Sequence, residues 1–277
     1  MQSGDRISEL YRGEVFAQAA RSVARRRIHW ICERAQGHSV MDIGCSQGIV
    51  STLLARQGLE VVGVDSSVAA IEYANADRAK ESPAVRERLS YILGDLYETQ
   101  LPEHTFNTVI MGEFLEHQAR PDRAVTRAYD LLAQGGKLIV TVPFGLFVRP
   151  DHKQTFYMAS LYKLIFPCFA ISEVEMIGRY LCLVCKRRET VLEGEPHTIE
   201  LGLVERAERE FHRREAALIE SLRASRASFS YRLGTAVVQG VHRPGRNTIL
   251  LPYRLLRLGI EGFRKRNKLK ATPPGTN

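Results

Sequence analysis

Residues 40–48 read VMDIGCSQG, and residues 49–58 continue as IVSTLLARQG. The short apolar run before the glycines predicts a buried strand, and the apolar spacing after Gly48 predicts a helix. Glycine is favoured between them because the backbone turns sharply there and comes close to whatever the loop binds. This stretch therefore predicts a strand, a ligand-binding turn and a helix, the repeating unit of an α/β sheet.

The same alternation continues on both sides of this unit. Further strands are predicted at residues 59–65, 88–95, 106–113 and 137–143. Helices are predicted at residues 13–36, 67–80, 122–136, 158–166 and 201–225. Two runs separated by a tight turn, residues 170–178 and 180–188, predict an antiparallel pair at the end of the sheet. The pattern indicates an α/β fold with a doubly wound, Rossmann-like sheet.

Charge is distributed unevenly along the chain. The 277 residues carry 39 Lys and Arg against 31 Asp and Glu, a formal net charge of +8. Residues 221–277 hold twelve of the basic residues and one acid, so residues 1–220 carry a net charge of −3. We therefore expect an N-terminal helical segment (1–36), a central domain (37–190) and a basic, helical C-terminal extension (191–277).

The composition excludes several classes of protein. With 44% hydrophobic and 25% charged residues, the chain is neither wholly disordered nor fibrous. It has no apolar run of the ~18 residues that a membrane-spanning helix needs, and its first residues lack the apolar core of a secretory signal. Five cysteines suit a reducing compartment, so a cytoplasmic location is expected. Cys182 and Cys185 form a C-x-x-C in a predicted strand, where they would point to opposite faces and not bind zinc together.

Acidic residues end the second and third predicted strands. Asp65 lies 21 residues after Gly44, close to the ~20 that separate a glycine turn from an acid that binds ribose hydroxyls. Asp95 ends the next strand, where we expect it to meet an adenine amino group. The glycine loop is not the G-x-G-x-x-G of nicotinamide-binding proteins, which argues against that alternative.

These motifs, together with FNTVIMGEFLEH at residues 106–117 and LAQGGKLIVTVP at 132–143, resemble class I S-adenosylmethionine-dependent methyltransferases. The resemblance covers residues 38–187. It implies a seven-stranded sheet whose last strand is antiparallel, and S-adenosyl-L-methionine as the cofactor. One departure is Ser46, where many members of the family have glycine.

The resemblance also implies which residues bind the cofactor. The glycine loop would face its methionine end, Asp65 its ribose and Asp95 its adenine. The residues expected to bind it are Asp42, Gly44, Cys45, Ser46, Gln47, Gly48, Asp65, Ser66, Asp95, Leu96 and Gly112.

The fourth predicted strand ends in a cluster of residues suited to catalysis. If a helical turn begins at Glu113, then Glu113, Glu116 and His117 share one face. Glu113, His117 and His152, in the loop after the fifth strand, are the expected catalytic groups, which position the acceptor and remove its proton. Glu113, Glu116, His117 and His152 are also candidate ligands of Mg²⁺ or Mn²⁺. The alternative is that Glu116 and His117 only orient the loop.

The E-x-x-E-H pattern is similar to two branches of the family: ubiquinone-pathway O-methyltransferases and small-RNA 3′-end 2′-O-methyltransferases. The segment after the fifth strand resembles small-molecule methyltransferases with sugar or lipid-linked acceptors, and would place Phe144, Phe147, Phe156 and Tyr157 around the acceptor unless they pack in the core. We therefore expect an enzyme that methylates a hydroxyl of a small molecule or glycan, as in polysaccharide biosynthesis. The alternatives are methylation of a quinone ring or of an RNA 3′ end, and a cofactor-binding module without chemistry.

The C-terminal extension has a separate set of expectations. Residues 247–270 mix Leu, Ile, Tyr and Phe with Arg and Lys. Such a segment suits peripheral contact with an anionic membrane surface, here the inner membrane surface, and less well nucleic acid. The alternative is a basic helix packed on the central domain. The sequence does not specify an oligomeric state.

Overall fold

A computed structural model describes residues 6–15, 18–147, 149–193, 199–228, 231, 233–235 and 237–238. The chain divides into two units, Met1–Glu210 and Phe211–Asn277. The basic segment at residues 247–270, with its expected membrane or nucleic-acid contact, lies outside the described residues.

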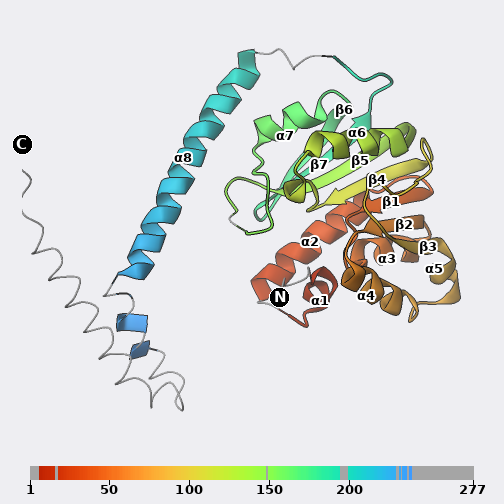
Figure 1. Cartoon of the computed structure of the whole chain (residues 1–277), viewed down its shortest axis with the longest axis horizontal. Helices are drawn as coiled ribbons and strands as arrows, with labels where there is room; N and C mark the ends of the chain where they lie inside the picture. Colours follow the sequence, from red (N-terminus) through yellow and green to blue (C-terminus); the bar gives the residue numbers. More distant parts are fainter. Residues whose placement is uncertain are drawn as a thin grey trace, which may run out of the picture. The chain divides into compact units, whose positions relative to one another are not determined.

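The first unit is built on a seven-stranded sheet with strand order β3-β2-β1-β4-β5-β7-β6 (Figure 1). Its strands are β1 (Ser39–Ile43), β2 (Glu60–Asp65), β3 (Leu89–Leu93), β4 (Phe106–Gly112), β5 (Leu132–Pro143), β6 (Phe169–Ile177) and β7 (Tyr180–Arg187). The first five strands pair in parallel, whereas β7 pairs antiparallel with both β5 and β6. The predicted seven-stranded doubly wound sheet with an antiparallel last strand is confirmed.

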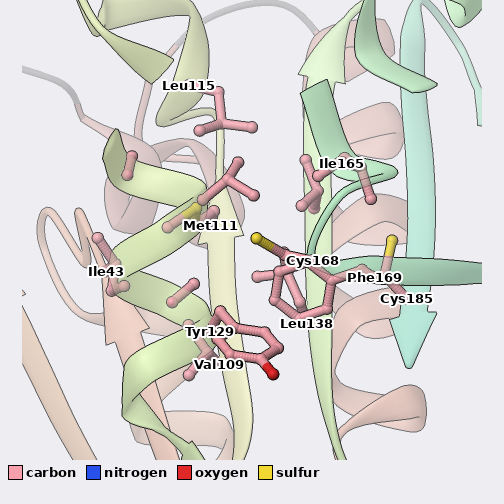
Figure 2. Packing of buried hydrophobic residues seen from close by; sticks show 14 of the residues in the cluster. Ile43, Val109, Met111, Leu115, Tyr129, Leu138, Ile165, Cys168, Phe169 and Cys185 are labelled. Atoms are coloured by element: carbon pink, nitrogen blue, oxygen red, sulfur yellow. The ribbon is translucent and has the colours of Figure 1, made fainter. Parts of the chain in front are cut away.

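Helices cover both faces of the sheet. They are α1 (Ile7–Arg12), α2 (Gln18–Arg34), α3 (Ile49–Arg56), α4 (Val68–Arg78), α5 (Pro83–Arg88), the 3₁₀ turn η1 (Leu115–His117), α6 (Pro121–Leu131) and α7 (Met158–Ile165). Apolar residues of α2 and α3 pack on one face, and those of α6 and α7 on the other. Figure 2 shows part of the apolar cluster between the sheet and helices α6 and α7, where Leu115 and Met111 lie above Tyr129 and Phe169. The carboxyl ends of the parallel strands therefore meet at one edge that the helices leave accessible.

The N-terminal segment differs from its prediction. The helix predicted over residues 13–36 is present as the shorter α2, Gln18–Arg34, and α1 before it ends at Arg12, next to Gly13 with its left-handed φ of +85°. α1 lies before the predicted start, and α5 was not predicted at all. Both are six-residue helices, too short to give a clear apolar period.

The predicted helix at 122–136 also extends too far. α6 ends at Leu131, and β5 starts at the next residue by pairing Leu132 with Phe106. The register then shifts, so that Lys137 pairs with Thr108, and Gly135 takes a φ of +74° inside the irregular stretch. Sheet pairing therefore overrides the helical spacing of these last residues.

Other local predictions agree with the structure. Cys182 and Cys185 are both buried on β7 but belong to different apolar layers, on opposite faces of the sheet. The charged helix predicted at 201–225 is α8 (Ile199–Ala227), which begins in the first unit and ends in the second. None of the helices in the described ranges is long and apolar enough to cross a bilayer.

Candidate functional site

The loop after β1 has the left-handed backbone that its glycines allow. Gly44 and Gly48 have φ of +68° and +77°, and Ser46 between them has φ of +49°. A Cβ atom at Gly44 would lie 2.6 Å from the ring of Phe114, and one at Gly48 would collide with the Tyr91 hydroxyl. Both glycines are therefore needed for shape as well as for backbone conformation.

Asp65, at the end of β2, fixes this loop to the start of the next helix. One carboxylate oxygen accepts a hydrogen bond from the Ser46 N–H at 2.9 Å, and the other accepts one from the Ser67 N–H at 2.8 Å. Ser67 in turn caps α4 by accepting a hydrogen bond from the Ala70 N–H. The single carboxylate thus aligns two of the segments that surround the site.

These segments enclose a pocket of about 440 Å³ at the carboxyl ends of β1 to β4. Its lining residues are Arg6, Ile43, Gly44, Ser46, Gln47, Val64, Asp65, Ser66, Ser67, Ala69, Ala70, Tyr73, Gly94, Asp95, Leu96, Tyr97, Gly112, Glu113, Phe114, His117, Gln118, Arg149 and Asp151. This is the position at which open α/β sheets bind ligands.

Eight of the eleven residues expected to bind the cofactor line this pocket: Gly44, Ser46, Gln47, Asp65, Ser66, Asp95, Leu96 and Gly112. Asp42, Cys45 and Gly48 do not line it. Asp42 is buried behind the loop and accepts a hydrogen bond from the Ser51 hydroxyl at 2.6 Å. Burial raises the pKa of Asp42 to about 6 and raises the pKa of the Cys45 thiol as well. These two side chains support the loop from beneath.

The raised pKa of Asp42 predicts a pH-dependent stability. A carboxyl with a pKa of 3.8 in the unfolded chain and about 6 in the folded one destabilises the fold as pH rises through that interval. The Asp42→Asn variant avoids this ionisation. We expect the unfolding free energy of the variant, minus that of the unaltered chain, to be about 1 kcal/mol larger at pH 8 than at pH 5. Urea unfolding at both pH values measures it, and a pH-independent difference would contradict the assignment.

Glu113 is held by a residue that the sequence analysis missed. Arg27, buried on α2, forms an ion pair with Glu113 and donates a hydrogen bond to the Thr141 hydroxyl at 2.9 Å. Its guanidinium also lies over the Tyr180 ring, 4.7 Å from the centroid. Glu113 has a φ of +57°, so its side chain leaves β4 in an unusual direction. The sequence did offer one indication of Arg27: it lies four residues before Ile31, so a charged residue falls on the apolar face of the predicted helix.

Glu116, His117 and His152 come together although Glu113 does not join them. One ligating atom from each of the three lies within 4.8 Å of the others. Glu116 is 1% exposed, and neither of its carboxylate oxygens has a hydrogen-bond partner on another described residue. Burial, and then the charge of Glu113, raise the pKa of Glu116 to about 8. A buried carboxylate without a hydrogen-bond partner destabilises the fold unless it is protonated or pairs with a cation.

The two histidines differ in their relation to the pocket. His117 lines it, and its Nδ1 lies 3.1 Å from the Asp151 carbonyl oxygen. His152 lies behind His117, with the rings edge to face and 4.9 Å between centroids. Burial, and then the charge of His117, lower the pKa of His152. The loop that carries His152 is fixed by the Glu116 carbonyl, which accepts hydrogen bonds from the N–H groups of Lys153 and Gln154.

The aromatic residues expected around an acceptor do not line the pocket itself. Phe156 is buried in the apolar layer beneath α6 and α7. Phe144 packs edge to face with Tyr157, at 5.4 Å between centroids, and Phe147 packs in the same way with His152. Their positions therefore shape the loop that carries His152.

The comparisons with known proteins agree with this geometry. Residues 41–140 match the family model described as a methyltransferase domain. A mitochondrial ubiquinone biosynthesis O-methyltransferase of Schizosaccharomyces pombe is 37% identical over 105 residues, which are 38% of this chain and 38% of that protein. The enzyme of the same name from Pseudomonas putida is 32% identical over 114 residues, 40% of this chain and 48% of that protein. The matched region spans less than half the length of these curated relatives.

Solved structures share the fold at low sequence identity. Magnesium protoporphyrin IX methyltransferase from Synechocystis, solved with bound SAH, has a TM-score of 0.55 and 19% identity, covering 66% of this chain and 94% of that one. The [4+2]-cyclase SpnF has a TM-score of 0.54 and 18% identity, covering 65% and 85%. The name of the second protein shows that this fold also serves another reaction.

Residues 41–140 are therefore similar to methyltransferase domains, and the first unit has the fold of a solved methyltransferase with bound SAH. Among curated proteins, the chain is similar over 105 and 114 residues to two ubiquinone biosynthesis O-methyltransferases.

Proposed function

We propose that this protein transfers the methyl group of S-adenosyl-L-methionine to a hydroxyl group of a small molecule or glycan. The observation that carries the proposal is the position of His117. It lines the same pocket as Asp65 and the glycine loop, so a cofactor and an ionisable imidazole share one cavity.

The reaction needs alignment and removal of one proton. The acceptor oxygen bonds to the methyl carbon while the bond between that carbon and sulfur breaks, which releases S-adenosylhomocysteine. A neutral imidazole is a suitable acceptor for the hydroxyl proton near neutral pH. His117 takes this role because it lines the pocket, and its contact with the Asp151 carbonyl orients the ring. His152 packs against His117 and positions it.

Glu113 also lines the pocket. Its pairing with Arg27 holds its side chain at the end of β4. A carboxylate there is suited to hold a second hydroxyl of the acceptor and thereby to fix the orientation of the first one. A sugar ring and a catechol both offer such a pair of hydroxyls.

As an alternative to His117 acting as the base, we propose that Glu116, His117 and His152 bind a divalent cation such as Mg²⁺ or Mn²⁺. The unpartnered, buried carboxylate of Glu116 is the observation that favours it. Two nitrogen ligands and one oxygen ligand suit Mn²⁺ better than Mg²⁺. When bound, such an ion would lower the pKa of an acceptor hydroxyl.

Binding of Mn²⁺ measured by electron paramagnetic resonance tests the cation. The Glu116→Gln variant is expected to bind Mn²⁺ at least about tenfold more weakly, because the one carboxylate among the three proposed ligands is lost. The same variant is expected to unfold at a higher temperature in the absence of metal at neutral pH, since it removes a buried carboxyl whose raised pKa favours the unfolded chain there. The Glu60→Gln variant, altered on an exposed part of β2, is the control. Equal Mn²⁺ binding by all three proteins would refute the site.

Alternative acceptors follow from the relatives. The ubiquinone-pathway relatives favour a quinone precursor as the second candidate acceptor, and a 3′-terminal RNA ribose is a third. Turnover with labelled cofactor decides among them: the proposal expects label in a sugar or saccharide precursor, whereas label only in a phenol or RNA selects an alternative. Calorimetry showing no binding of S-adenosylhomocysteine would overturn the function as a whole.

A further inference from the structure

The tripeptide Arg-Pro-Asp occurs twice in the chain, at residues 120–122 and 149–151. The first copy lies at the start of α6 and does not line the pocket. In the second copy, Arg149 and Asp151 both line the pocket together with His117. In each copy the arginine forms an ion pair with the aspartate two residues later. The two copies therefore share their local chemistry and differ in their position relative to the pocket.

The two arginines use their hydrogen-bond donors differently. Arg120 donates from Nε to one oxygen of Asp122 at 3.0 Å and from Nη2 to the other at 2.7 Å. Arg149 donates to Asp151 from Nε alone, at 3.2 Å, and its Nη groups donate to no other residue that the structure describes. Since a guanidinium has five N–H donors, both Nη groups of Arg149 remain available to a ligand.

Asp151 divides its carboxylate between Arg149 and His117. Its Oδ1 accepts the hydrogen bond from Arg149, and its Oδ2 lies 3.6 Å from the His117 Nδ1. The Arg149 carbonyl also accepts a hydrogen bond from the His152 N–H at 3.2 Å, which closes the loop into a turn. The guanidinium is therefore held beside the expected catalytic imidazole, on what we call the acceptor side of the pocket.

The carboxyl groups near Arg149 leave room for an anion. Asp151 is paired with Arg149, and Glu113 is paired with Arg27. Burial, and then the charge of Glu113, raise the pKa of Glu116 to about 8, so this carboxyl is mostly protonated at neutral pH when no cation is bound. An anion bound by Arg149 therefore meets little repulsion from these groups.

Further positive charge lies along the same loop. Arg179, in the turn between β6 and β7, has its guanidinium over the Phe147 ring, 4.3 Å from the centroid. Phe147 in turn packs against His152. Arg179 and the exposed Lys153 form no ion pair with any residue in the described part of the chain. These charges favour an anionic acceptor over a neutral one.

We propose that Arg149 binds a phosphate group of the acceptor, so that the molecule methylated carries a phosphate as well as the reacting hydroxyl. The inference rests on the proposed function, since it assumes that cofactor and acceptor share this pocket. The planar fork of arginine matches phosphate with two parallel N–H···O bonds. A phosphate monoester suits the loop better than a carboxylate, because it has three acceptor oxygens and a charge of about −1.5 to −2 at neutral pH.

Inorganic pyrophosphate is the probe that tests the subsite without an acceptor. It is titrated into the whole chain saturated with S-adenosylhomocysteine, in the presence of EDTA so that no bound cation holds the anion. The NMR signals of the His117 and His152 imidazoles report binding beside them and not at the basic C-terminal extension. The same titration is made on the Arg149→Gln variant and on the matched control Arg120→Gln, altered in the copy of the tripeptide outside the pocket.

We expect pyrophosphate to shift these signals saturably in the unaltered chain. The Arg149→Gln variant should bind it at least about tenfold more weakly, because charge-assisted hydrogen bonds are lost, and the Arg120→Gln variant should match the unaltered chain within about twofold. Imidazole signals that do not respond in the unaltered chain would overturn the proposal. An equal loss in both variants would reduce the effect to net charge and would overturn it as well.

The Asp151→Asn variant distinguishes binding by Arg149 from mere ordering of the loop. It weakens the ion pair but keeps the guanidinium, so we expect it to bind pyrophosphate at least as tightly as the unaltered chain. A loss as large as that of the Arg149→Gln variant would mean that Arg149 acts only through Asp151, against the proposal. Thermal unfolding of each variant shows whether a lost affinity reflects a lost fold.

Calorimetry with S-adenosylhomocysteine separates this inference from the function on which it rests. If the unaltered chain does not bind S-adenosylhomocysteine, the proposed function fails and the inference with it. If it binds S-adenosylhomocysteine but the pyrophosphate results are negative, only the inference fails.

Turnover with labelled cofactor then identifies the source of the phosphate. Hexose 1-phosphates, nucleotide diphosphate hexoses and polyprenyl diphosphate-linked sugars are each compared with their unphosphorylated counterparts. Label in one of the phosphorylated classes supports the proposal and names the source, whereas label only in the unphosphorylated counterparts would overturn it.

Discussion

The Asp65→Ala variant is expected to bind S-adenosylhomocysteine at least about 100-fold more weakly than the unaltered chain. The Asp65 carboxylate accepts the N–H groups of both Ser46 and Ser67, so its removal frees the glycine loop and the start of α4 together. Two charge-assisted hydrogen bonds of ~1.5–3 kcal/mol each correspond to a loss of this size. Any direct bond from Asp65 to the ligand adds to it. Isothermal titration at fixed salt measures the change.

The Asp65→Asn variant is the matched comparison. Its side chain has the same shape and retains one oxygen acceptor, so one of the two loop contacts survives. We expect its affinity for S-adenosylhomocysteine to lie between that of the unaltered chain and that of the Asp65→Ala variant. If the Asp65→Ala and Asp65→Asn variants bind S-adenosylhomocysteine as tightly as the unaltered chain does, Asp65 has no part in organising the pocket.

The His117→Ala variant is expected to lower methyl transfer by about 100-fold or more while leaving the affinity for S-adenosylhomocysteine within about threefold. General-base catalysis contributes 10²–10⁴-fold to typical rates, which sets the scale. His117 lines the pocket, but the cofactor end is organised by Asp65 and the glycine loop. Turnover with labelled cofactor and the acceptor found by screening, together with calorimetry, separates the two effects.

The His38→Ala variant is the control for this experiment. His38 is exposed, pairs with Glu60 at 3.5 Å and lies at the opposite end of β1 from the pocket. It should leave turnover unchanged. If the His117→Ala and His152→Ala variants both retain full turnover, neither imidazole takes part in the reaction. A chain that binds S-adenosylhomocysteine but methylates no acceptor would favour the cofactor-binding module.

Much of the fold could be read directly from the chain because its signals are local. The strand, glycine turn and helix around Gly44 require a particular backbone over ten consecutive residues, and glycine is the residue that adopts it without strain. Asp65 follows a strand directly, so its place at the sheet edge is fixed by the parallel pairing of β1 and β2. The order of strands and helices then leaves few possible topologies.

The limits of the local signal are equally clear. Residues 132–136 have helical spacing, but Leu132 already pairs with Phe106 of β4 and the pairing resumes at Lys137 after a register shift, so the stretch belongs to β5. Sequence reasoning also placed Glu113 with Glu116 and His117 on one helical turn. In the structure η1 begins only at Leu115, so Glu113 lies outside it and pairs with Arg27.

What the sequence alone determined is the sheet, the glycine loop and the acids at the strand ends, all set by neighbouring residues. What only the tertiary structure decided is which distant side chains complete the site. His152 joins Glu116 and His117 across 35 residues, and Arg6 reaches the pocket because Ser8 is bonded to Gln47, 39 residues away. Such contacts depend on how helices and loops pack against the sheet. No periodicity along the chain encodes that packing, since it is the sum of many burial and hydrogen-bond terms between remote segments.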